Sequence, residues 1–178
     1  MSQGDDAGTI PDRVVVWDTE KYEPIVTFEV PIFGWDMAFS PDSQLLAVAM
    51  FAGNLQVFDL TTETMLFDLK GHTSTVFRLS FNHTGTELIS VSFDGTVRVW
   101  DMQTGLETLI IPLVDSSAMS VAVSPDGNWL YLGTRSGHVR AFALTLETLL
   151  SLAEARTTRS LTEVECQQYL HVDVCPSP

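Results

Sequence analysis

The residues with the greatest potential for chemistry are a histidine, a serine and an aspartate, at positions His72, Ser90 and Asp94. Serine hydrolases use these three residue types as general base, nucleophile and orienting carboxylate. The residues around Ser90 lack the G-x-S-x-G turn that exposes a nucleophilic serine in α/β-hydrolases. A small hydrolase that uses these three side chains is therefore one interpretation, and a repeat in the chain supports a different one.

The chain repeats itself with a period of roughly forty residues. The segment Val57-Phe58-Asp59 returns as Val99-Trp100-Asp101, and Val16-Trp17-Asp18 is an earlier copy. Glycines keep the same spacing at Gly53, Gly95 and Gly137. A repeat of this length, with short apolar segments between turn residues, is typical of the blades of a β-propeller.

The third copy, residues 71–110, predicts one four-stranded unit. We expect strands over residues 75–81, 87–92, 96–101 and 106–110, with a tight hairpin at Asp94-Gly95. Ser40-Pro-Asp-Ser43 and Ser124-Pro-Asp-Gly127 predict the equivalent first turns of the neighbouring units. A single sheet of this kind cannot bury both faces, so the units must stack on one another in an all-β fold.

The third copy resembles the WD-repeat family of β-propellers. The resemblance rests on Gly71-His72, Ser90, Asp94 and Trp100-Asp101. It implies that His72, Ser90, Asp94 and Trp100 form a structural hydrogen-bonded set inside one blade and have no catalytic role. Such a buried polar set is tolerated when each of its members has a partner.

The other copies depart from this pattern. The equivalent residues are Val30, Val48, Ala52 and Phe58 in the second copy, and Val114, Leu132, Ser136 and Phe142 in the fourth. We expect these blades to have replaced the polar set by apolar packing. Replacing all partners together costs less than leaving one of them unpaired.

The spacing predicts a partial propeller over residues 1–144, with about three and a half blades at about 13–30, 32–70, 71–110 and 115–144. WD-type propellers usually contain seven blades, so we expect an open arc that forms the C-terminal portion of a larger propeller. Further blades would then lie in an upstream segment or in another chain, or copies of the chain would associate through open blade edges. The alternative is a closed ring of four blades in which the N-terminal strands complete the last blade.

Residues 145–178 predict a helical tail that packs on the last blade. Leu146, Leu149 and Leu150 recur at helical spacing, and we expect a helix from about Leu146 to Ala155. A second short helix is predicted near Thr162, where Thr162-Glu-Val-Glu165 fits a capping box. The tail resembles the end of WD-repeat regions in large bacterial regulators, which favours a bacterial signalling protein or a truncated fragment of a signalling NTPase.

Composition excludes several classes of function. The 178 residues carry a formal net charge of −14, which disfavours contact with nucleic acid. The N-terminus lacks the basic and apolar regions of a signal peptide, and no apolar run is long enough to span a membrane, so we expect a cytoplasmic location.

No cofactor or metal is expected. Cys166, His171 and Cys175 could supply zinc ligands, but they lack paired spacing, and packing or a disulfide explains them more simply. A calcium site at Asp5, Asp6 and Asp12 is likewise less favoured than an acidic, flexible end.

One candidate partner-binding set comes from a single position of the repeat. Trp35, Phe77 and Met119 each lie near the start of a first strand, where WD-repeat proteins contact partners at the upper rim. Phe33 and Arg135 are weaker companions. The same three side chains could instead line the inner wall or fill gaps between blades. We therefore expect a non-enzymatic interaction scaffold whose partner is a protein or a peptide.

Overall fold

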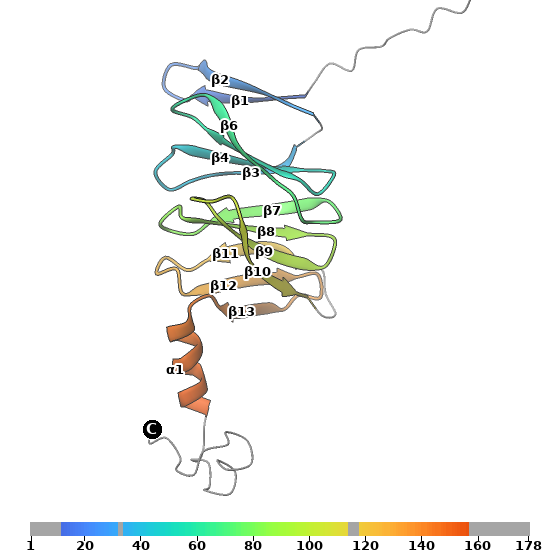
Figure 1. The fold of residues 1–178 in the computed structure, drawn as a ribbon, viewed down its shortest axis with the longest axis vertical. Helices are drawn as coiled ribbons and strands as arrows, with labels where there is room; N and C mark the ends of the chain where they lie inside the picture. The colour runs from blue at the N-terminus through green and yellow to red at the C-terminus, as the bar shows by residue number, and fades with distance from the viewer. Residues whose placement is uncertain (1–11, 32–33, 114–117, 157–178) are drawn as a thin grey trace, which may run out of the picture. The chain divides into compact units, whose positions relative to one another are not determined.

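The computed structural model describes residues 12–31, 34–113 and 118–156. These residues form strands and one helix, which group into four antiparallel sheets (Figure 1). The first sheet contains β1 (Asp12–Asp18) and β2 (Glu23–Val30). The second contains β3 (Gly34–Phe39), β4 (Leu45–Met50), β5 (Leu55–Asp59) and β6 (Thr64–Leu69).

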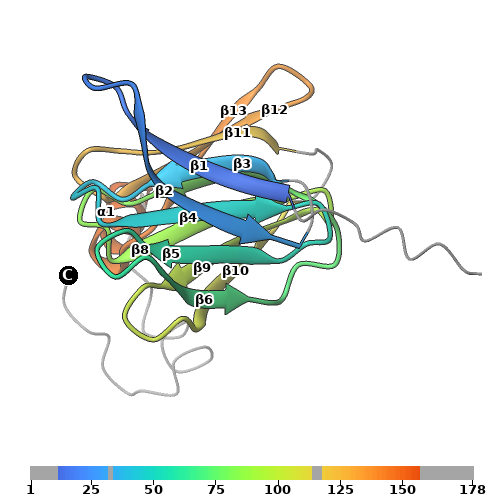
Figure 2. The ribbon, with the colours of Figure 1, turned by 90° about the horizontal axis from the view of Figure 1, so that it is seen from above.

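The third sheet contains β7 (Val76–Phe81), β8 (Glu87–Ser92), β9 (Thr96–Asp101) and β10 (Glu107–Pro112). The fourth contains β11 (Ala118–Val123), β12 (Trp129–Thr134) and β13 (Val139–Ala143). Each sheet is a meander in which consecutive strands pair, and Figure 2 shows the order β3, β4, β5 and β6 across the second sheet. The all-β, partial propeller prediction is confirmed.

The turns fold as their residues predict. In the second sheet, Ser40 Oγ accepts a hydrogen bond from Leu45 N, at 2.9 Å, and Asp42 Oδ1 accepts one from Gln44 N, at 3.0 Å. In the fourth sheet, Ser124 Oγ accepts the equivalent bond from Trp129 N, at 2.9 Å. These side chains satisfy the backbone donors of the turn and so set the register of the strands that follow.

Two apolar clusters join consecutive sheets. One cluster joins the second and third sheets and contains Ala47, Ala49, Leu55, Val57, Leu69, Val76, Leu79, Phe81, Leu88, Trp100 and Met102. The other joins the first and second sheets and contains Val14, Val26, Phe28, Val30, Leu46, Val48, Met50 and Phe58. Each sheet therefore depends on its neighbours for burial of its faces, as the repeat predicts.

The first and fourth sheets remain separate sheets. β1 pairs with β2, and the fourth sheet has the order β11, β12, β13 without either of these strands. Trp17 of β1 is 55% exposed, whereas its repeat equivalents Phe58 and Trp100 are 3% and 2% exposed. The closed ring in which the N-terminal strands complete the last blade is therefore not the arrangement seen, and none of the other three described sheets contains β1 or β2.

The chain divides into two compact units, residues 1–142 and 143–178. In the second unit, α1 (Leu146–Arg156) begins after Thr145, whose Oγ1 accepts a hydrogen bond from Thr148 N at 3.3 Å. Its Leu146, Leu149 and Leu150 are exposed. Packing of this helix on the last blade stays a prediction, and the second helix expected near residue 162 lies outside the described residues.

No helix in the described part of the chain has the length and apolar character needed to cross a membrane.

Two equivalent glycines provide a matched test of the contact between the second and third sheets. Gly53 and Gly95 both have positive φ values, 92° and 82°. A Cβ at Gly53 would lie 2.7 Å from the His72 carbonyl oxygen, whereas nothing lies within 4 Å of a Cβ at Gly95. We expect Gly95→Ala to cost about 1–2 kcal/mol of unfolding free energy from its left-handed backbone alone. Gly53→Ala should cost clearly more in urea unfolding, and equal costs would contradict the packing described.

Candidate functional site

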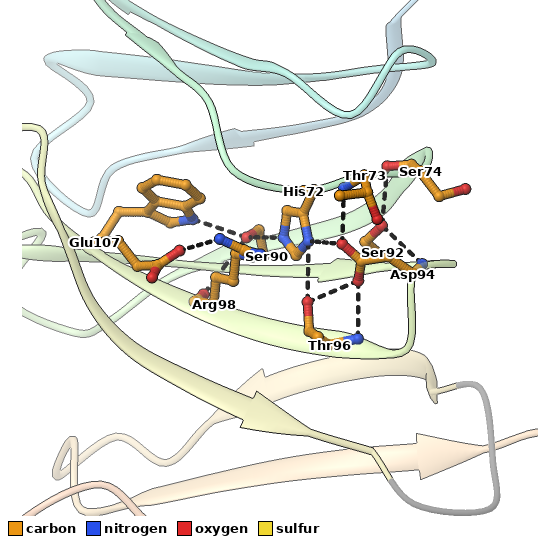
Figure 3. Close-up of polar contacts among 10 residues, drawn as sticks. His72, Thr73, Ser74, Ser90, Ser92, Asp94, Thr96, Arg98 and Glu107 are labelled. Carbon is orange, nitrogen blue, oxygen red and sulfur yellow. Dashed lines mark hydrogen bonds and ion pairs between the residues drawn. The ribbon is translucent and has the colours of Figure 1, made fainter.

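The four residues of the predicted polar set come together within the third sheet. His72 precedes β7, Ser90 lies in β8, Asp94 occupies the hairpin between β8 and β9, and Trp100 lies in β9. His72 Nδ1 lies 2.8 Å from Asp94 Oδ2, and His72 Nε2 lies 2.8 Å from Ser90 Oγ (Figure 3). Trp100 Nε1 lies 2.8 Å from Ser90 Oγ.

The direction of each hydrogen bond follows from the chemistry of its ends. The Asp94 carboxylate can only accept, so Nδ1 of neutral His72 carries the hydrogen and Nε2 is an acceptor. The Trp100 indole N–H can only donate, so Ser90 Oγ accepts from it and donates its own hydrogen to His72 Nε2. The chain Trp100–Ser90–His72–Asp94 thus gives a partner to the indole N–H of Trp100, the hydroxyl of Ser90 and both ring nitrogens of His72.

Asp94 accepts hydrogen bonds from both sides of the hairpin. Thr73 N donates to Oδ2 at 3.0 Å, while Thr96 donates to Oδ1 from its backbone N at 2.9 Å and from its hydroxyl at 2.7 Å (Figure 3). Burial raises the pKa of Asp94, but the hydrogen bonds from Thr96, Thr73 and His72 outweigh this effect and lower the pKa to about 2. Asp94 is therefore a carboxylate that ties the loop before β7 to the hairpin after β8.

His72 is held in its neutral form. Burial lowers its pKa, and this effect outweighs the hydrogen bond and negative charge of Asp94, which raise the pKa. The side chain of His72 is inaccessible to solvent, and that of Asp94 is 6% exposed. A proton added to His72 would place a second hydrogen on Nε2, facing the hydroxyl of Ser90.

The distances between His72, Ser90 and Asp94 match those of a hydrolytic triad, but Ser90 is not accessible to a substrate. Ser90 is 0% exposed, and its Oγ already receives the hydrogen of Trp100. A nucleophilic serine must reach a substrate carbonyl, beside donors that stabilise the oxyanion. The geometry therefore suits a structural connection between strands better than acyl transfer.

The backbone approaches this network closely at the residue before the histidine. A Cβ at Gly71 would lie 2.5 Å from Arg98 Nη1 and 3.1 Å from Trp100 Cη2. Arg98 in turn pairs with Glu107 of β10 (Figure 3). A side chain at position 71 would therefore displace the Arg98 guanidinium and press on the edge of the indole ring.

The second repeat replaces this network by apolar contacts, as its residues predict. Val30, Val48 and Phe58 stand at the positions of His72, Ser90 and Trp100, and all three belong to one buried cluster. Phe58 stacks on Phe28 with ring centroids 4.3 Å apart. In the fourth repeat, Leu132 is likewise 0% exposed.

The three residues of the candidate partner-binding set occupy β-bulges. The register shifts between Gly34 and Asp36, between Val76 and Arg78, and between Ala118 and Ser120, so the residue between each pair is the bulged one. These bulged residues are Trp35, Phe77 and Met119. A bulge re-aims a side chain relative to its neighbours, and bulges are common beside binding sites.

The bulged side chains do not share one environment. Trp35 is 46% exposed and Met119 is 44% exposed, whereas Phe77 is 2% exposed. Phe77 lies beneath Phe93, with ring centroids 4.4 Å apart in a stacked arrangement. The sequence-based set is therefore divided, with Phe77 supporting the surface and Trp35 forming part of it.

Two aromatic residues that the sequence analysis did not single out complete this surface. Trp35 contacts Phe51 and Phe93, with ring centroids at 6.3 Å and 6.4 Å, and the two phenylalanines are 57% and 50% exposed. We name Trp35, Phe51 and Phe93 the aromatic surface. Phe51 and Phe93 share one repeat position, directly after the second strand, and this recurrence was the signal available in the sequence.

The aromatic surface as defined does not include the weaker candidates from the sequence, Arg135 and Phe33. Arg135 stands at the position of Phe51 and Phe93 in the fourth repeat and is exposed. Phe33 lies outside the described residues, as do the proposed zinc ligands Cys166, His171 and Cys175. No cluster of three His, Cys, Asp or Glu side chains suited to a metal occurs in residues 12–31, 34–113 and 118–156.

Comparison with known proteins agrees with this geometry. Residues 63–101, which include His72, Ser90, Asp94 and Trp100, match the family described as WD domain, G-beta repeat. This segment of the chain is thus similar to one WD repeat. The U3 small nucleolar RNA-associated protein 21 homolog of Schizosaccharomyces pombe is 30% identical to it over 147 residues. The match covers 82% of this chain and 16% of that relative.

The matched segment contains the whole polar network, which agrees with the predicted structural role of these four side chains. The family match supports the resemblance drawn from Gly71-His72 to Trp100-Asp101. The relative named above is a eukaryotic protein, so the similarity of the tail to bacterial regulators has no support from these comparisons.

We expect the network to contribute to stability as a unit. His72→Ala would remove one buried hydrogen-bond partner each from Asp94 and Ser90, at a cost of about 1–3 kcal/mol in the free energy of unfolding. The exposed His83 provides the matched control, and His83→Ala should change the urea midpoint little. Equal midpoints for wild type, His72→Ala and Asp94→Asn would contradict the network's structural role.

The lowered pKa of His72 predicts a pH dependence of stability. Above the ordinary histidine pKa of about 6.5, His72 is neutral in both the folded and the unfolded chain. Its contribution to the free energy of unfolding is then fully present. As the pH falls below this value the unfolded chain takes up the proton first, so the free energy of unfolding decreases, by at most about 1.4 kcal/mol per pH unit for one proton. Urea unfolding between pH 7 and pH 5 should show this decrease in the free energy of unfolding in the wild type. The decrease should be absent, as far as it comes from residue 72, in His72→Gln. Parallel pH profiles of the two proteins would refute it.

Proposed function

We propose that the chain is a protein-interaction scaffold that engages a protein or peptide partner through its aromatic surface. The observation that carries the proposal is the contact of three exposed rings, Trp35, Phe51 and Phe93, which come from two adjacent sheets. Exposed aromatic side chains held on a rigid framework dominate the binding energy of many protein interfaces.

Two hydrogen bonds hold the backbone beside the aromatic surface in place. Thr75 Oγ1 donates a hydrogen bond to the Phe51 carbonyl oxygen at 2.8 Å, which links the second and third sheets directly beside the rings. Ser92 Oγ donates to the Ser74 carbonyl oxygen at 2.9 Å on the other side of the same loop. The rings are therefore presented in a preorganised arrangement, which lowers the entropy cost of binding.

The polar network supports this function indirectly. Asp94 follows Phe93 and is held by Thr73, Thr96 and His72, so the network sets the position of the hairpin that carries Phe93. This arrangement gives His72 a positioning role and leaves no task for it as a base. We do not propose hydrolysis, because Ser90 is buried and committed to Trp100 and His72.

The comparisons suggest one broader context. The relative's name associates that protein with a small nucleolar RNA. For this chain the net charge of −14 disfavours direct contact with phosphates, so we propose that it contacts proteins in whatever assembly it joins. Its place in a signalling pathway and its cytoplasmic location stay predictions from the sequence.

A selection experiment tests the aromatic surface and does not require the natural partner. Peptides would be selected from a displayed library against the wild-type chain, and their affinities measured by calorimetry. We expect Trp35→Ala and Phe93→Ala each to weaken binding about tenfold or more, as loss of an aromatic hot spot does. Tyr131→Ala is the control, because Tyr131 is 40% exposed on β12 and has no part in the aromatic surface. Selected peptides that bind Trp35→Ala as tightly as wild type would contradict the proposal.

A further inference from the structure

The two ends of the second, third and fourth sheets carry different charges. Consecutive strands are antiparallel, so the turns after the first and third strands lie at one end and the hairpins after β4, β8 and β12 lie at the other. The turns at the first end, over residues 40–44, 60–63, 82–86, 102–106 and 124–128, contain no lysine or arginine. We name this the acidic end, because carboxylates lie in these turns or directly beside them, at Asp42, Asp59, Glu63, Glu87, Asp101, Glu107 and Asp126.

The opposite end carries the aromatic surface together with cations. Lys70 lies there and pairs with Asp68 at 3.0 Å. Arg78 and Arg135 also lie there and are exposed, and neither has a carboxylate within ion-pair distance among residues 12–31, 34–113 and 118–156. The chain has 23 Asp and Glu against 9 Lys and Arg, so exposed arginines that find no carboxylate in its described part are unexpected.

Both arginines stand beside the aromatic surface. Arg78 Nη1 donates a hydrogen bond to the Phe77 carbonyl oxygen at 2.7 Å, and the Phe77 ring stacks beneath Phe93 with centroids 4.4 Å apart. The repeat places Arg135, because the step that carries Trp35 to Phe77 also carries Phe93 to Arg135. Phe93 of the third sheet lies 6.4 Å from Trp35 of the second, and β11 lies beside β7 as β7 lies beside β3. We therefore expect Arg135 of the fourth sheet to stand over Phe77 in the same way.

The carboxylates next to the rings in sequence are occupied by the fold. Asp36 follows Trp35 and is half-buried, and its Oδ2 accepts a hydrogen bond from Leu79 N at 2.9 Å. Asp94 follows Phe93, and its side chain is 6% exposed within the polar network. The exposed charges beside the three rings are therefore the two guanidinium groups.

We propose that the aromatic surface binds an acidic peptide segment, in which an apolar anchor side chain is flanked by aspartate or glutamate. The anchor lies against Trp35, Phe51 and Phe93, and the neighbouring carboxylates pair with Arg78 and Arg135. A guanidinium group can donate two parallel hydrogen bonds to one carboxylate, and arginine is enriched at protein interfaces. This inference rests on the proposed function and adds to it the composition and charge of the partner.

The net negative charge of the chain is compatible with an acidic peptide at this place. Strands such as β3 and β8 contain 6 residues and span about 20 Å, which separates the acidic end from the aromatic surface. The Debye length at physiological ionic strength is about 8 Å, so the acidic end acts only weakly on a short peptide bound at the opposite end. A nucleic acid is a continuous polyanion that extends well beyond the rings, and it would meet the other carboxylates of the chain.

A peptide library with a fixed tryptophan tests the proposal on the full 178-residue chain. Random residues flank the tryptophan on both sides, and displayed peptides are selected against the wild type at physiological ionic strength. We expect aspartate and glutamate to be enriched beside the tryptophan relative to the unselected library. A synthetic peptide with the most enriched sequence should bind more weakly as the sodium chloride concentration rises, because its charge pairs are exposed to solvent.

Three charge reversals locate the binding of this synthetic peptide. Arg78→Glu, Arg135→Glu and Lys21→Glu change the net charge equally, and Lys21 lies in the turn between β1 and β2, which corresponds to residues 60–63 of the acidic end. We expect each arginine variant to bind the peptide at least about threefold more weakly than wild type, and Lys21→Glu to bind it like wild type. Arg135 is an exposed loop residue, so Arg135→Glu tests the proposal even if Arg78→Glu disturbs the fold.

Several results would overturn the proposal. Enrichment of neutral or basic residues would do so, as would arginine variants that bind the peptide as tightly as Lys21→Glu. A single-stranded oligouridylate that binds the chain and loses its affinity in both arginine variants would replace the acidic peptide by a nucleic acid. Selected peptides that need Trp35 but carry no acidic residues would refute this inference and leave the proposed function intact, whereas peptides indifferent to Trp35→Ala would contradict both.

Discussion

Burial in this protein comes from contacts between sheets, because a four-stranded meander has two faces and no apolar interior of its own. The consequence is visible at one repeat position, where Trp100 and Phe58 are buried against a preceding sheet and Trp17, which has none, is 55% exposed. The same rule explains the difference between Phe81, which is 8% exposed, and its repeat equivalent Phe39, which is 53% exposed. Among the described sheets, exposure at these positions therefore depends on the presence of a preceding sheet and does not reflect weak strands.

The polar network of the third repeat is an addition to this packing. The second repeat fills the same space with Val30, Val48 and Phe58, so a blade can be built without hydrogen bonds at these positions. What the network adds is a connection from the loop before β7 to the hairpin after β8, through Asp94. That hairpin carries Phe93 and so couples the stability of the blade to the geometry of the aromatic surface.

Much of this organisation could be predicted from the sequence, because turn residues and period-two alternation determine strands locally. The strands over Glu87–Ser92 and Thr96–Asp101 have the predicted bounds, and β10 is displaced, at Glu107–Pro112 in place of 106–110. A bulge near Thr108 accompanies that displacement, and such a local change of register leaves no clear mark in the sequence. Likewise, the shared position of Trp35 and Phe77 did not reveal that one would be exposed and the other covered by Phe93, since that outcome depends on contacts between side chains of adjacent loops.

The central claim is that neighbouring sheets, together with the network of the third repeat, stabilise each blade. Native-state amide hydrogen exchange, followed residue by residue, tests this claim most directly because it ranks the opening free energies of individual strands. The account predicts the greatest protection in β4, β5, β8 and β9, which pair on both sides within sheets that have neighbours, and clearly lower protection in β1. Equal protection of β1 and β9 would contradict it.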